Sequence, residues 1–495
     1  GTSTNVRKVG IIVFGSTMLA LVVRFAFLIV IARVLIVEEF GIWHNINDLT
    51  TNFILPATLI SFWAQRFFAR RHEGSGKTGL ILNIIVGLLV SLIFALLVPF
   101  LVEIFKLSSY IILYELLILY IMENYIDYAL EAILRVSRPV ALGYGQLVFH
   151  ISKFTVVMVM FYIFNIRNIW AVIFSFIFSL FLKEIFYFRL ARKHLSGRFN
   201  KSYAYEWLKG STAKGYEIFV LEGVQIPGMI MMTYVGALAV AYYGAVQNIT
   251  SIITITLMLA TAMYPALLQN KGKEVAGAAI RLVLIFLLPF AIFIIALGDV
   301  LLEILNPSYV VAYPIIVPST IAFAMSTLSD AMKEIILGIE KFDEKAKIPI
   351  KTLFHSYIFV AFSARWGFVI VAMSLAFIIY PHISNPLLAA EIHGMISLLG
   401  ELATFLIVSY VVFVRLRISI GRRHVMWYIF ANLQLSLLIY LTIGYFKSSL
   451  LLLALYSIAA LLEYTLVLSL DTEFRVLIRK MFQMLLYHRK STLSK

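Results

Sequence analysis

The sequence has no cysteine and few charged residues. Its 495 residues include no Cys, so disulfide bridges, thiol nucleophiles and cysteine-ligated metals are excluded. Asp, Glu, Lys and Arg together make up 14% of the chain, well below the roughly 25% of soluble domains. Acidic residues are the scarcer sign, with 26 Asp and Glu against 41 Lys and Arg. The shortage of charge indicates that most of the chain avoids water.

Apolar residues fill the space that charge leaves. They account for 62% of the chain, and runs of about 20 or more recur along its whole length. Such runs predict transmembrane helices, because a helix satisfies its own backbone hydrogen bonds within lipid. We therefore predict an all-α, polytopic membrane protein.

Fourteen spans can be placed on the sequence. Residues 1–205 would form a six-helix lobe and 206–415 a second one, followed by spans 13 and 14 within 416–470 and an amphipathic cytoplasmic tail over 471–495. The predicted spans are 9–35, 43–65, 79–105, 109–133, 140–164, 168–189, 213–239, 244–269, 277–304, 311–338, 352–380, 385–414, 425–446 and 449–470.

The basic residues orient these spans. With both termini in the cytoplasm, only Lys106, Arg167 and Lys447 fall in outer loops, whereas most of the other bases fall in inner loops and the tail. This bias is the positive-inside pattern of membrane proteins. The net charge of +15 therefore reflects topology, and we predict no nucleic-acid partner.

A repeat relates the two halves. At an offset of 203 residues Gly41, Asn45, Ile46, Thr51, Ala57 and Thr58 are matched by identical residues, namely Gly244, Asn248, Ile249, Thr254, Ala260 and Thr261. Over the roughly eighteen positions compared, about one or two identical pairs are expected by chance at this composition. Six spans per copy would insert both copies the same way round, as parallel repeats. Duplicated helical bundles of this kind are typical of transporters.

Four basic side chains lie deep in predicted spans. Arg24, Lys153 and Arg365 are near mid-membrane, and His150 is one turn from Lys153. One interpretation is that they line a cavity and attract an anion, since the arginine fork suits phosphate and lysine acts as a point charge. The alternative is that they only neutralise buried acids and tie helices together.

The buried acids leave two interpretations open. Asp48 in span 2 would contribute to the substrate cavity, and Glu123 and Asp127, with Glu131 in the same i, i+4, i+8 series, lie roughly on one face of span 4. A structural role is one interpretation for the span-4 acids. Binding of a coupling proton or sodium ion is the other.

Three helix-breaking residues are candidate hinges. Pro56 in span 2 and Pro227-Gly228 in span 7 weaken helix hydrogen bonding, which suits either alternating access or a static kink. No arrangement of metal ligands is predicted. No extramembrane segment is large enough for a catalytic site, so we predict that the protein is not an enzyme.

Several short motifs resemble one family. These are Ile31-Ala32-Arg33-Val34-Leu35 before Glu38-Glu39-Phe40-Gly41, Gln65-Arg66-Phe67-Phe68-Ala69-Arg70, and Leu470-Asp471-Thr472-Glu473. They resemble polysaccharide flippases of the Wzx type, in the superfamily of multidrug, oligosaccharidyl-lipid and polysaccharide exporters. The resemblance implies two six-helix lobes forming a V and a lipid-linked oligosaccharide as cargo. It also implies a prokaryotic plasma membrane, with membrane lipids and other glycan-assembly proteins as partners.

Two other functions of the same superfamily stay open. A lipid II-type flippase also has fourteen spans, and a multidrug antiporter coupled to a cation would use the acids Asp48, Glu123 and Asp127. An isoprenoid diphosphate cargo favours a cationic cavity, which Arg24 and Lys153 supply. No cofactor is predicted beyond coupling to a proton or sodium gradient or to the membrane potential. A membrane glycosyltransferase is disfavoured because it needs a large catalytic loop.

Overall fold

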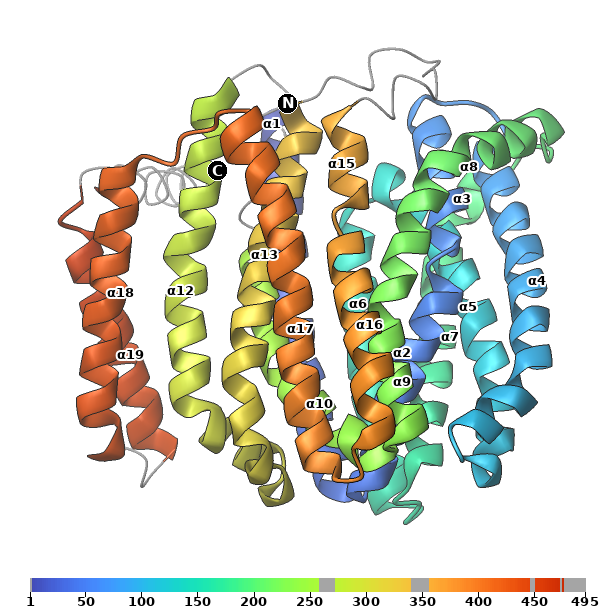
Figure 1. The fold of residues 1–495 in the computed structure, drawn as a ribbon. Helices are drawn as coiled ribbons and strands as arrows, with labels where there is room; N and C mark the ends of the chain where they lie inside the picture. The colour runs from blue at the N-terminus through green and yellow to red at the C-terminus, as the bar shows by residue number, and fades with distance from the viewer. Residues whose placement is uncertain (1, 258–271, 340–355, 446–449, 472–473, 476–495) are drawn as a thin grey trace. The chain divides into compact units, whose positions relative to one another are not determined.

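The computed structural model describes residues 2–257, 272–339, 356–445, 450–471 and 474–475, and every regular element within them is a helix (Figure 1). Eleven of these helices are long and apolar enough to cross a membrane. They correspond to predicted spans 1, 3–6 and 8–13. The prediction of an all-α polytopic membrane protein is therefore confirmed. Most of the predicted amphipathic tail lies outside the described residues.

The three remaining predicted spans are broken or short. Span 2 is divided into α2 (Val37–Ile54) and α3 (Ala57–Ala69), and span 7 into α8 (Lys201–Glu222) and α9 (Ile226–Tyr234). Span 14 corresponds to α19 (Leu450–Leu468). The connection between α7 (Ile169–Ala191) and α8 is short, since α8 begins at Lys201. Asn200 caps α8 there, because its side chain accepts hydrogen bonds from the Ser202 and Tyr203 amides at 2.9 and 3.3 Å.

Both predicted proline hinges lie at helix breaks. Pro56 precedes the first residue of α3, and Pro227 is in the first turn of α9, directly after the 3-10 turn Gly223–Gln225. Proline is tolerated at such positions because its missing N–H would have no partner within the helix. A Cβ on Gly228 would lie 3.6 Å from Asp48 Oδ2, an ordinary contact, so crowding does not require this glycine. Motion about these breaks stays a prediction.

The chain packs as two compact units. Unit 1 comprises Gly1–Ala245, Glu303–Ala312 and Val369–Ile396, and unit 2 comprises Val246–Leu302, Tyr313–Phe368 and Ser397–Lys495. Besides α2, α3, α8 and α9, unit 1 holds α1 (Thr2–Val34), α4 (Ser75–Ile104), α5 (Ile111–Ser137), α6 (Val140–Tyr162), α7 (Ile169–Ala191) and most of α10 (Ala237–Thr250). Besides α19, unit 2 holds α12 (Gly272–Leu305) in most of its length, α13 (Ile316–Ile339), α15 (Tyr357–Ser363) and α18 (Arg422–Thr442). α16 (Trp366–Ile379) and α17 (Pro386–Ser409) contribute to both units. The predicted lobes follow the duplication rather than this packing, and they stay a prediction.

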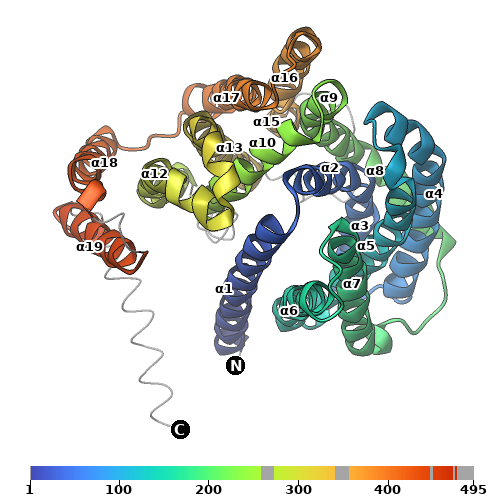
Figure 2. The same cartoon turned by 90° about the horizontal axis from the view of Figure 1, so that it is seen from below.

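Within unit 1, α6 packs between α1 and α7, and α5 packs against α4 and α7 (Figure 2). The buried faces of α5 and α7 carry Leu130, Ile133 and Tyr187 in one apolar cluster. This packing sets charged residues of α5 opposite those of α7. It also sets α1 beside α6.

Helices α2 and α10 pack closely at the two glycines of the repeat, Gly41 and Gly244. A Cβ on Gly41 would lie 1.9 Å from the Ala237 carbonyl oxygen, so only glycine allows this approach. Gly244 in turn receives the ring of His44, whose Cγ would lie 2.7 Å from an added Cβ. The duplicated glycines are therefore contact points between the two copies' equivalent helices inside unit 1.

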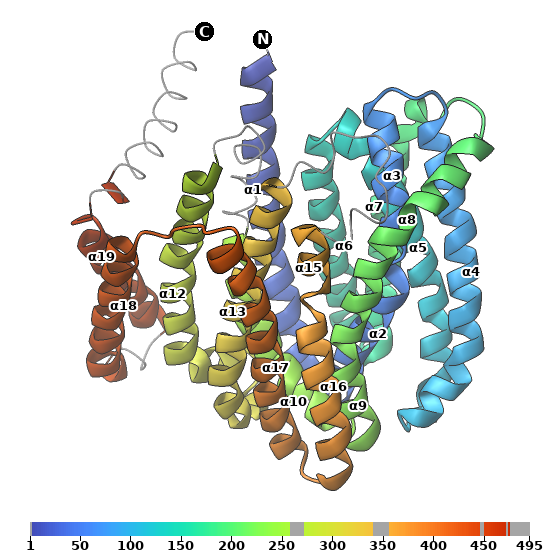
Figure 3. The ribbon, with the colours of Figure 1, turned by 45° about the horizontal axis from the view of Figure 1, so that its top comes forward.

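In unit 2, α18 and α19 form a pair that packs on α12 (Figure 3). Tyr464 of α19 donates a hydrogen bond to the Ile285 carbonyl of α12 at 3.0 Å and accepts one from Asn432 of α18 at 3.1 Å. Apolar packing alone discriminates poorly among helix neighbours within lipid. These buried polar contacts fix which helices meet.

Candidate functional site

Lys153 of α6 is buried among aromatic rings in unit 1. The residue is 4% exposed. Its Nζ lies 4.4 Å from the ring centroid of Phe27 on α1, 4.3 Å from that of Phe176 on α7 and 4.9 Å from that of Phe149, one turn earlier on α6. The negative π faces of the rings attract an ammonium group. Among the described residues, no carboxylate lies within ion-pair distance of Nζ. Lys153 therefore has aromatic rings around its amine and no acidic partner among the described residues.

Arg24 and His150 extend this basic region. Arg24 lies on α1 one turn before Phe27, is exposed, and forms no ion pair with a described acid. His150 is partly buried, and its Nδ1 lacks a hydrogen-bond partner within the described part of the chain. Arg24, Lys153 and Lys183 all act electrostatically on His150. Two of the predicted bases and the predicted histidine thus come together between α1 and α6. We call Arg24, His150 and Lys153 the cationic site.

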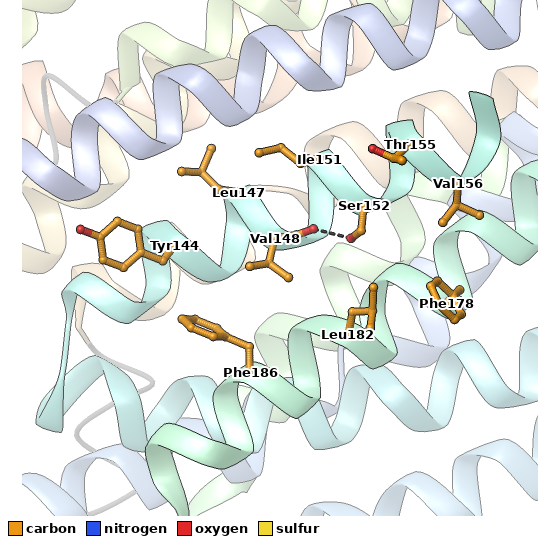
Figure 4. A pocket seen from close by; sticks show the side chains of 10 residues that line it. All are labelled: Tyr144, Leu147, Val148, Ile151, Ser152, Thr155, Val156, Phe178, Leu182 and Phe186. Atoms are coloured by element: carbon orange, nitrogen blue, oxygen red, sulfur yellow. Dashed lines mark hydrogen bonds between the residues drawn. The ribbon is translucent and has the colours of Figure 1, made fainter. Parts of the chain in front are cut away.

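The opposite side of α6 is apolar. A groove of about 560 Å³ runs between α6 and α7, and Figure 4 shows its lining by Tyr144, Leu147, Val148, Ile151, Ser152, Thr155, Val156, Phe178, Leu182 and Phe186. The Ser152 hydroxyl bonds back to the Val148 carbonyl and so presents little polarity to the groove. Helix α6 therefore buries Lys153 on one side and offers a hydrocarbon-compatible surface on the other.

A second charged cluster joins α5 to α7. Lys183 Nζ lies 2.7 Å from Asp127 Oδ2 and 3.0 Å from Glu131 Oε1, and the Tyr187 hydroxyl donates to the same Glu131 oxygen at 3.3 Å. Lys183 is 4% exposed. The predicted ion-coupling residue Asp127 is thus paired, but with a lysine of α7 and not with Arg24, Lys153 or Arg365. We call Glu123, Asp127, Glu131, Lys183 and Glu184 the α5–α7 cluster.

This cluster contains more acid than base. Glu131 also contacts Arg135 at 3.7 Å, so its charge is offset from two sides. Glu123 Oε2 and Glu184 Oε1 are buried and have no hydrogen-bond partner among the described residues. Glu184 is 8% exposed and feels the charges of Glu123 and Asp127.

Arg365 belongs to unit 2, where two acids engage it. It lies in the break between α15 and α16. One terminal nitrogen lies 2.6 and 2.7 Å from the two carboxylate oxygens of Glu401 on α17. The other donates to Ser326 at 2.9 Å and to Asp330 at 3.0 Å on α13. Both terminal nitrogens are therefore committed to helix pairing, which is the second of the two interpretations given above for the deep bases.

Asp48 occupies a third polar spot in unit 1. Its Oδ2 lies 3.8 Å from His44 Nε2, one turn earlier on α2, and it faces Gly228 of α9. The Asp48 side chain is 20% exposed. The described residues contain no group of three or more His, Cys, Asp or Glu side chains that could hold a metal ion.

Sequence reasoning missed Lys183, Glu184 and Glu401. Lys183 and Glu184 lie near the inner end of a predicted span, where charged residues are ordinary. The signal available in the sequence was their adjacency inside an apolar run, and the structure shows that both residues are under a tenth exposed. Glu401 gave no such local signal, because its arginine partner is 36 residues away in the sequence.

Comparison with solved structures places the fold in one class of membrane transporter. Over 94% of this chain and 100% of the other, it is similar to the lipid II flippase MurJ in its inward closed conformation, with a TM-score of 0.71 and 13% sequence identity. It is also similar to an inward-facing multidrug resistance MATE family transporter of the MOP superfamily, with a TM-score of 0.61, 11% identity, and 82% and 98% of the two chains covered.

A mutant of the Vibrio cholerae MATE transporter VcmN is similar as well, with a TM-score of 0.55, 12% identity, and 84% and 98% coverage. At these identities the likeness concerns the fold, and the chain has the fold of the MOP superfamily. No protein-family model matches the sequence, and no curated protein does. The comparisons thus support the expected fold, while membership of the superfamily and of the Wzx family stays a prediction.

Proposed function

We propose that the protein is a flippase that moves a lipid-linked oligosaccharide, carried on an isoprenoid phosphate or diphosphate, from the cytoplasmic to the outer leaflet. The observation that carries the proposal is the cationic site. Lys153 is buried and Arg24 exposed, and neither is neutralised by a described acid. A base kept unpaired within a membrane bundle is costly, which marks it as functional.

The geometry suggests how the head group would be held. Arg24 is accessible, and its planar fork can bind two phosphate oxygens at once. The Lys153 amine lies against three aromatic rings. Cation–π attraction is worth about 2 kcal/mol when desolvated, so a diphosphate anion can compete for the ammonium. The lipid tail would stay in the bilayer while the protein alternates between its two open states.

The remaining parts of the proposal follow the charge pattern. We place the protein as a multi-pass component of a prokaryotic plasma membrane, with both termini in the cytoplasm. A proton or sodium gradient or the membrane potential would drive transport. Membrane lipids and other glycan-assembly proteins would be its partners. We infer no enzymatic activity.

Transport in proteoliposomes tests the cationic site. The probe is a fluorescent lipid-linked oligosaccharide whose label is bleached from outside by a membrane-impermeant reductant. We expect Arg24→Ala and Lys153→Ala to slow its flipping at least tenfold, because each removes a charge that meets the head group. Arg189→Ala and Lys193→Ala are matched controls at exposed positions and should transport normally. Unchanged flipping in the first two variants would contradict the assignment.

Two related functions have support of their own. The likeness to MurJ favours a lipid II-type cargo, which the same assay separates by using labelled lipid II as the probe. The unneutralised acids of the α5–α7 cluster and the likeness to MATE transporters favour a cation-coupled multidrug antiporter. Efflux of cationic dyes that is lost in Asp48→Asn or Asp127→Asn, with no flipping of lipid-linked sugar, would establish that alternative.

A further inference from the structure

Two charged helix pairs among the described residues, α5 with α7 and α13 with α17, occupy equivalent positions in the two halves of the repeat. At the offset of 203 residues that relates the repeats, Asp127 matches Asp330 and Glu131 matches Glu334. Glu123 matches Ser326, which binds Arg365. The acidic face of α5 is therefore repeated on α13. Such agreement extends the repeat well beyond the segment around Gly41.

Helices α7 and α17 show the same relation at a different offset. They begin at Ile169 and Pro386, which are 217 residues apart, and at that offset Glu184 matches Glu401. Most of the buried positions of the two helices coincide in the same alignment. Buried Val172, Ser179, Lys183, Glu184, Tyr187 and Ala191 align with buried Ala389, Ile396, Gly400, Glu401, Thr404 and Val408. The two glutamates thus share a helix position and a degree of burial.

The acids are duplicated, but the bases are not. Lys183 comes from α7, and its match on α17 is Gly400. Arg365 comes from the break before α16, and the residue 217 positions earlier, in α6, is Val148. In each half the recurring carboxylates meet a base, but that base lies on α7 in the first half and in the break before α16 in the second. The carboxylates therefore recur in both halves, whereas the bases that meet them do not.

The two matched glutamates differ in what they contact. Both oxygens of Glu401 accept hydrogen bonds from Arg365. Glu184 has no ion pair among the described residues, and its Oε1 is buried without a hydrogen-bond partner. Because Lys183 is engaged by Asp127 and Glu131, no described base within ion-pair distance remains for Glu184 or for Glu123.

The charged and titratable surroundings of Glu184 can be named helix by helix. From α5, Glu123 and Asp127 act on it, and Lys183 acts from its own helix. From α6, His150 lies near Lys183. From α2, Glu39 interacts with the backbone of Ile169, at the far end of α7. Glu184 is buried, and Glu123 is half-buried with its Oε2 atom out of contact with solvent. Because Glu123 acts electrostatically on Glu184 and neither has a base among the described residues, repulsion and lost hydration favour one proton on the two carboxylates.

We propose that Glu184, together with Glu123, binds one exchangeable proton in unit 1. The proton forms an O–H bond to a carboxylate oxygen of Glu184, neutralises one of the two charges, and is released to water when the pair becomes hydrated. In unit 2 the equivalent position is occupied by the Arg365 guanidinium, so the second copy holds a fixed internal cation where the first holds a mobile one. This proposal does not depend on the identity of the cargo.

Infrared difference spectroscopy of the reconstituted full-length protein tests the site without any transport substrate. Acidification of the wild type should produce a protonated-carboxyl band that shifts in D₂O and is missing in Glu184→Gln. Glu123→Gln should keep the band but move its appearance to lower pH, because the neighbouring charge is gone. The matched control Glu401→Gln and the exposed control Glu103→Gln should leave the band unchanged.

Several outcomes would overturn the proposal. These are a wild-type spectrum without the band, a band that persists in Glu184→Gln, or a site that responds to sodium instead of pH at constant ionic strength. If Glu184→Gln does not fold, as judged by gel filtration, Glu184→Asp decides the question. It retains a carboxyl group, so the band should persist at a shifted frequency, and an unshifted band would assign the proton to another residue.

Discussion

Arg365 and Lys153 are both bases buried among membrane helices, yet their surroundings are opposite. Arg365 meets two carboxylates and a hydroxyl, whereas Lys153 meets three phenyl rings and no described acid. A buried base with matched acids joins helices and is unavailable for an external anion. A buried base held only by rings keeps most of its capacity to bind one. The difference predicts which of the two bases is structural and which is functional, and depth in the membrane does not.

Unit 1 contains both kinds of base within a few helices. Lys183 is paired with Asp127 and Glu131 between α5 and α7, and Lys153 is unpaired between α1 and α6. Unit 1 thus contains acidic and basic side chains that do not all form ion pairs with one another. Unneutralised acid lies at Glu184 and Glu123, and unneutralised base at Lys153 and Arg24. Such separation provides distinct places for a cation and an anion in one helical bundle.

The largest effect is expected from Arg365→Ala. Its removal leaves Glu401 and Asp330 without their base. The Glu401 side chain is only 10% exposed, and breaking such a buried ion pair from one side costs about 3–5 kcal/mol, whereas the Asp330 side chain is 38% exposed and adds less. We expect a corresponding loss in the free energy of unfolding, measured by reversible denaturation in mixed micelles. Arg365→Ala combined with Glu401→Gln should recover part of the loss. Unchanged stability in Arg365→Ala would show that the ion pairs of Arg365 do not hold these helices together, which contradicts its assignment as a structural base.

A matched pair of substitutions in unit 1 should separate stability from transport. Lys183→Met leaves Asp127 without its base and should cost about 3 kcal/mol, somewhat less than Arg365→Ala, because Arg135 still reaches Glu131. Lys153→Met removes an unneutralised buried charge and places a thioether among rings, so it should be neutral or stabilising. Flipping should nevertheless slow at least tenfold in Lys153→Met. Equal destabilisation of the two variants would show that Lys153 has a hidden partner.

The sequence was sufficient for the parts that depend on hydropathy and regular spacing. Apolar runs predict the helices, and Pro56 and Pro227 mark real breaks because proline removes a helix hydrogen bond whatever surrounds it. Ion pairing was not predictable in the same way. Asp127 could have met any of several bases, and the choice of Lys183 follows from the rotation of α7 about its axis. That rotation is set by packing between helices and leaves little trace in one sequence.

The smallest expected effect concerns a single ring of the Lys153 site, Phe176. Its ring is 4.3 Å from Lys153 Nζ and also contacts Phe27 edge-on at 5.7 Å, so a simple loss of stability in Phe176→Leu would mix packing with cation–π attraction. A double-mutant cycle separates them, with Phe176→Leu measured in the wild type and in Lys153→Met. We expect a coupling of about 1 kcal/mol between the two positions.

Phe178→Leu is the matched control for that cycle, because Phe178 lies on the same helix but lines the apolar groove and stacks on Phe174. It should show no coupling to Lys153. A coupling near zero at Phe176 as well would mean that the rings only fill space around Lys153. The ammonium would then be stabilised by something other than π attraction, and the contrast with the acid-bound Arg365 would need a different physical basis. A coupling confined to Phe176 would instead show that aromatic faces replace carboxylates at this base, which leaves the charge available to an incoming phosphate.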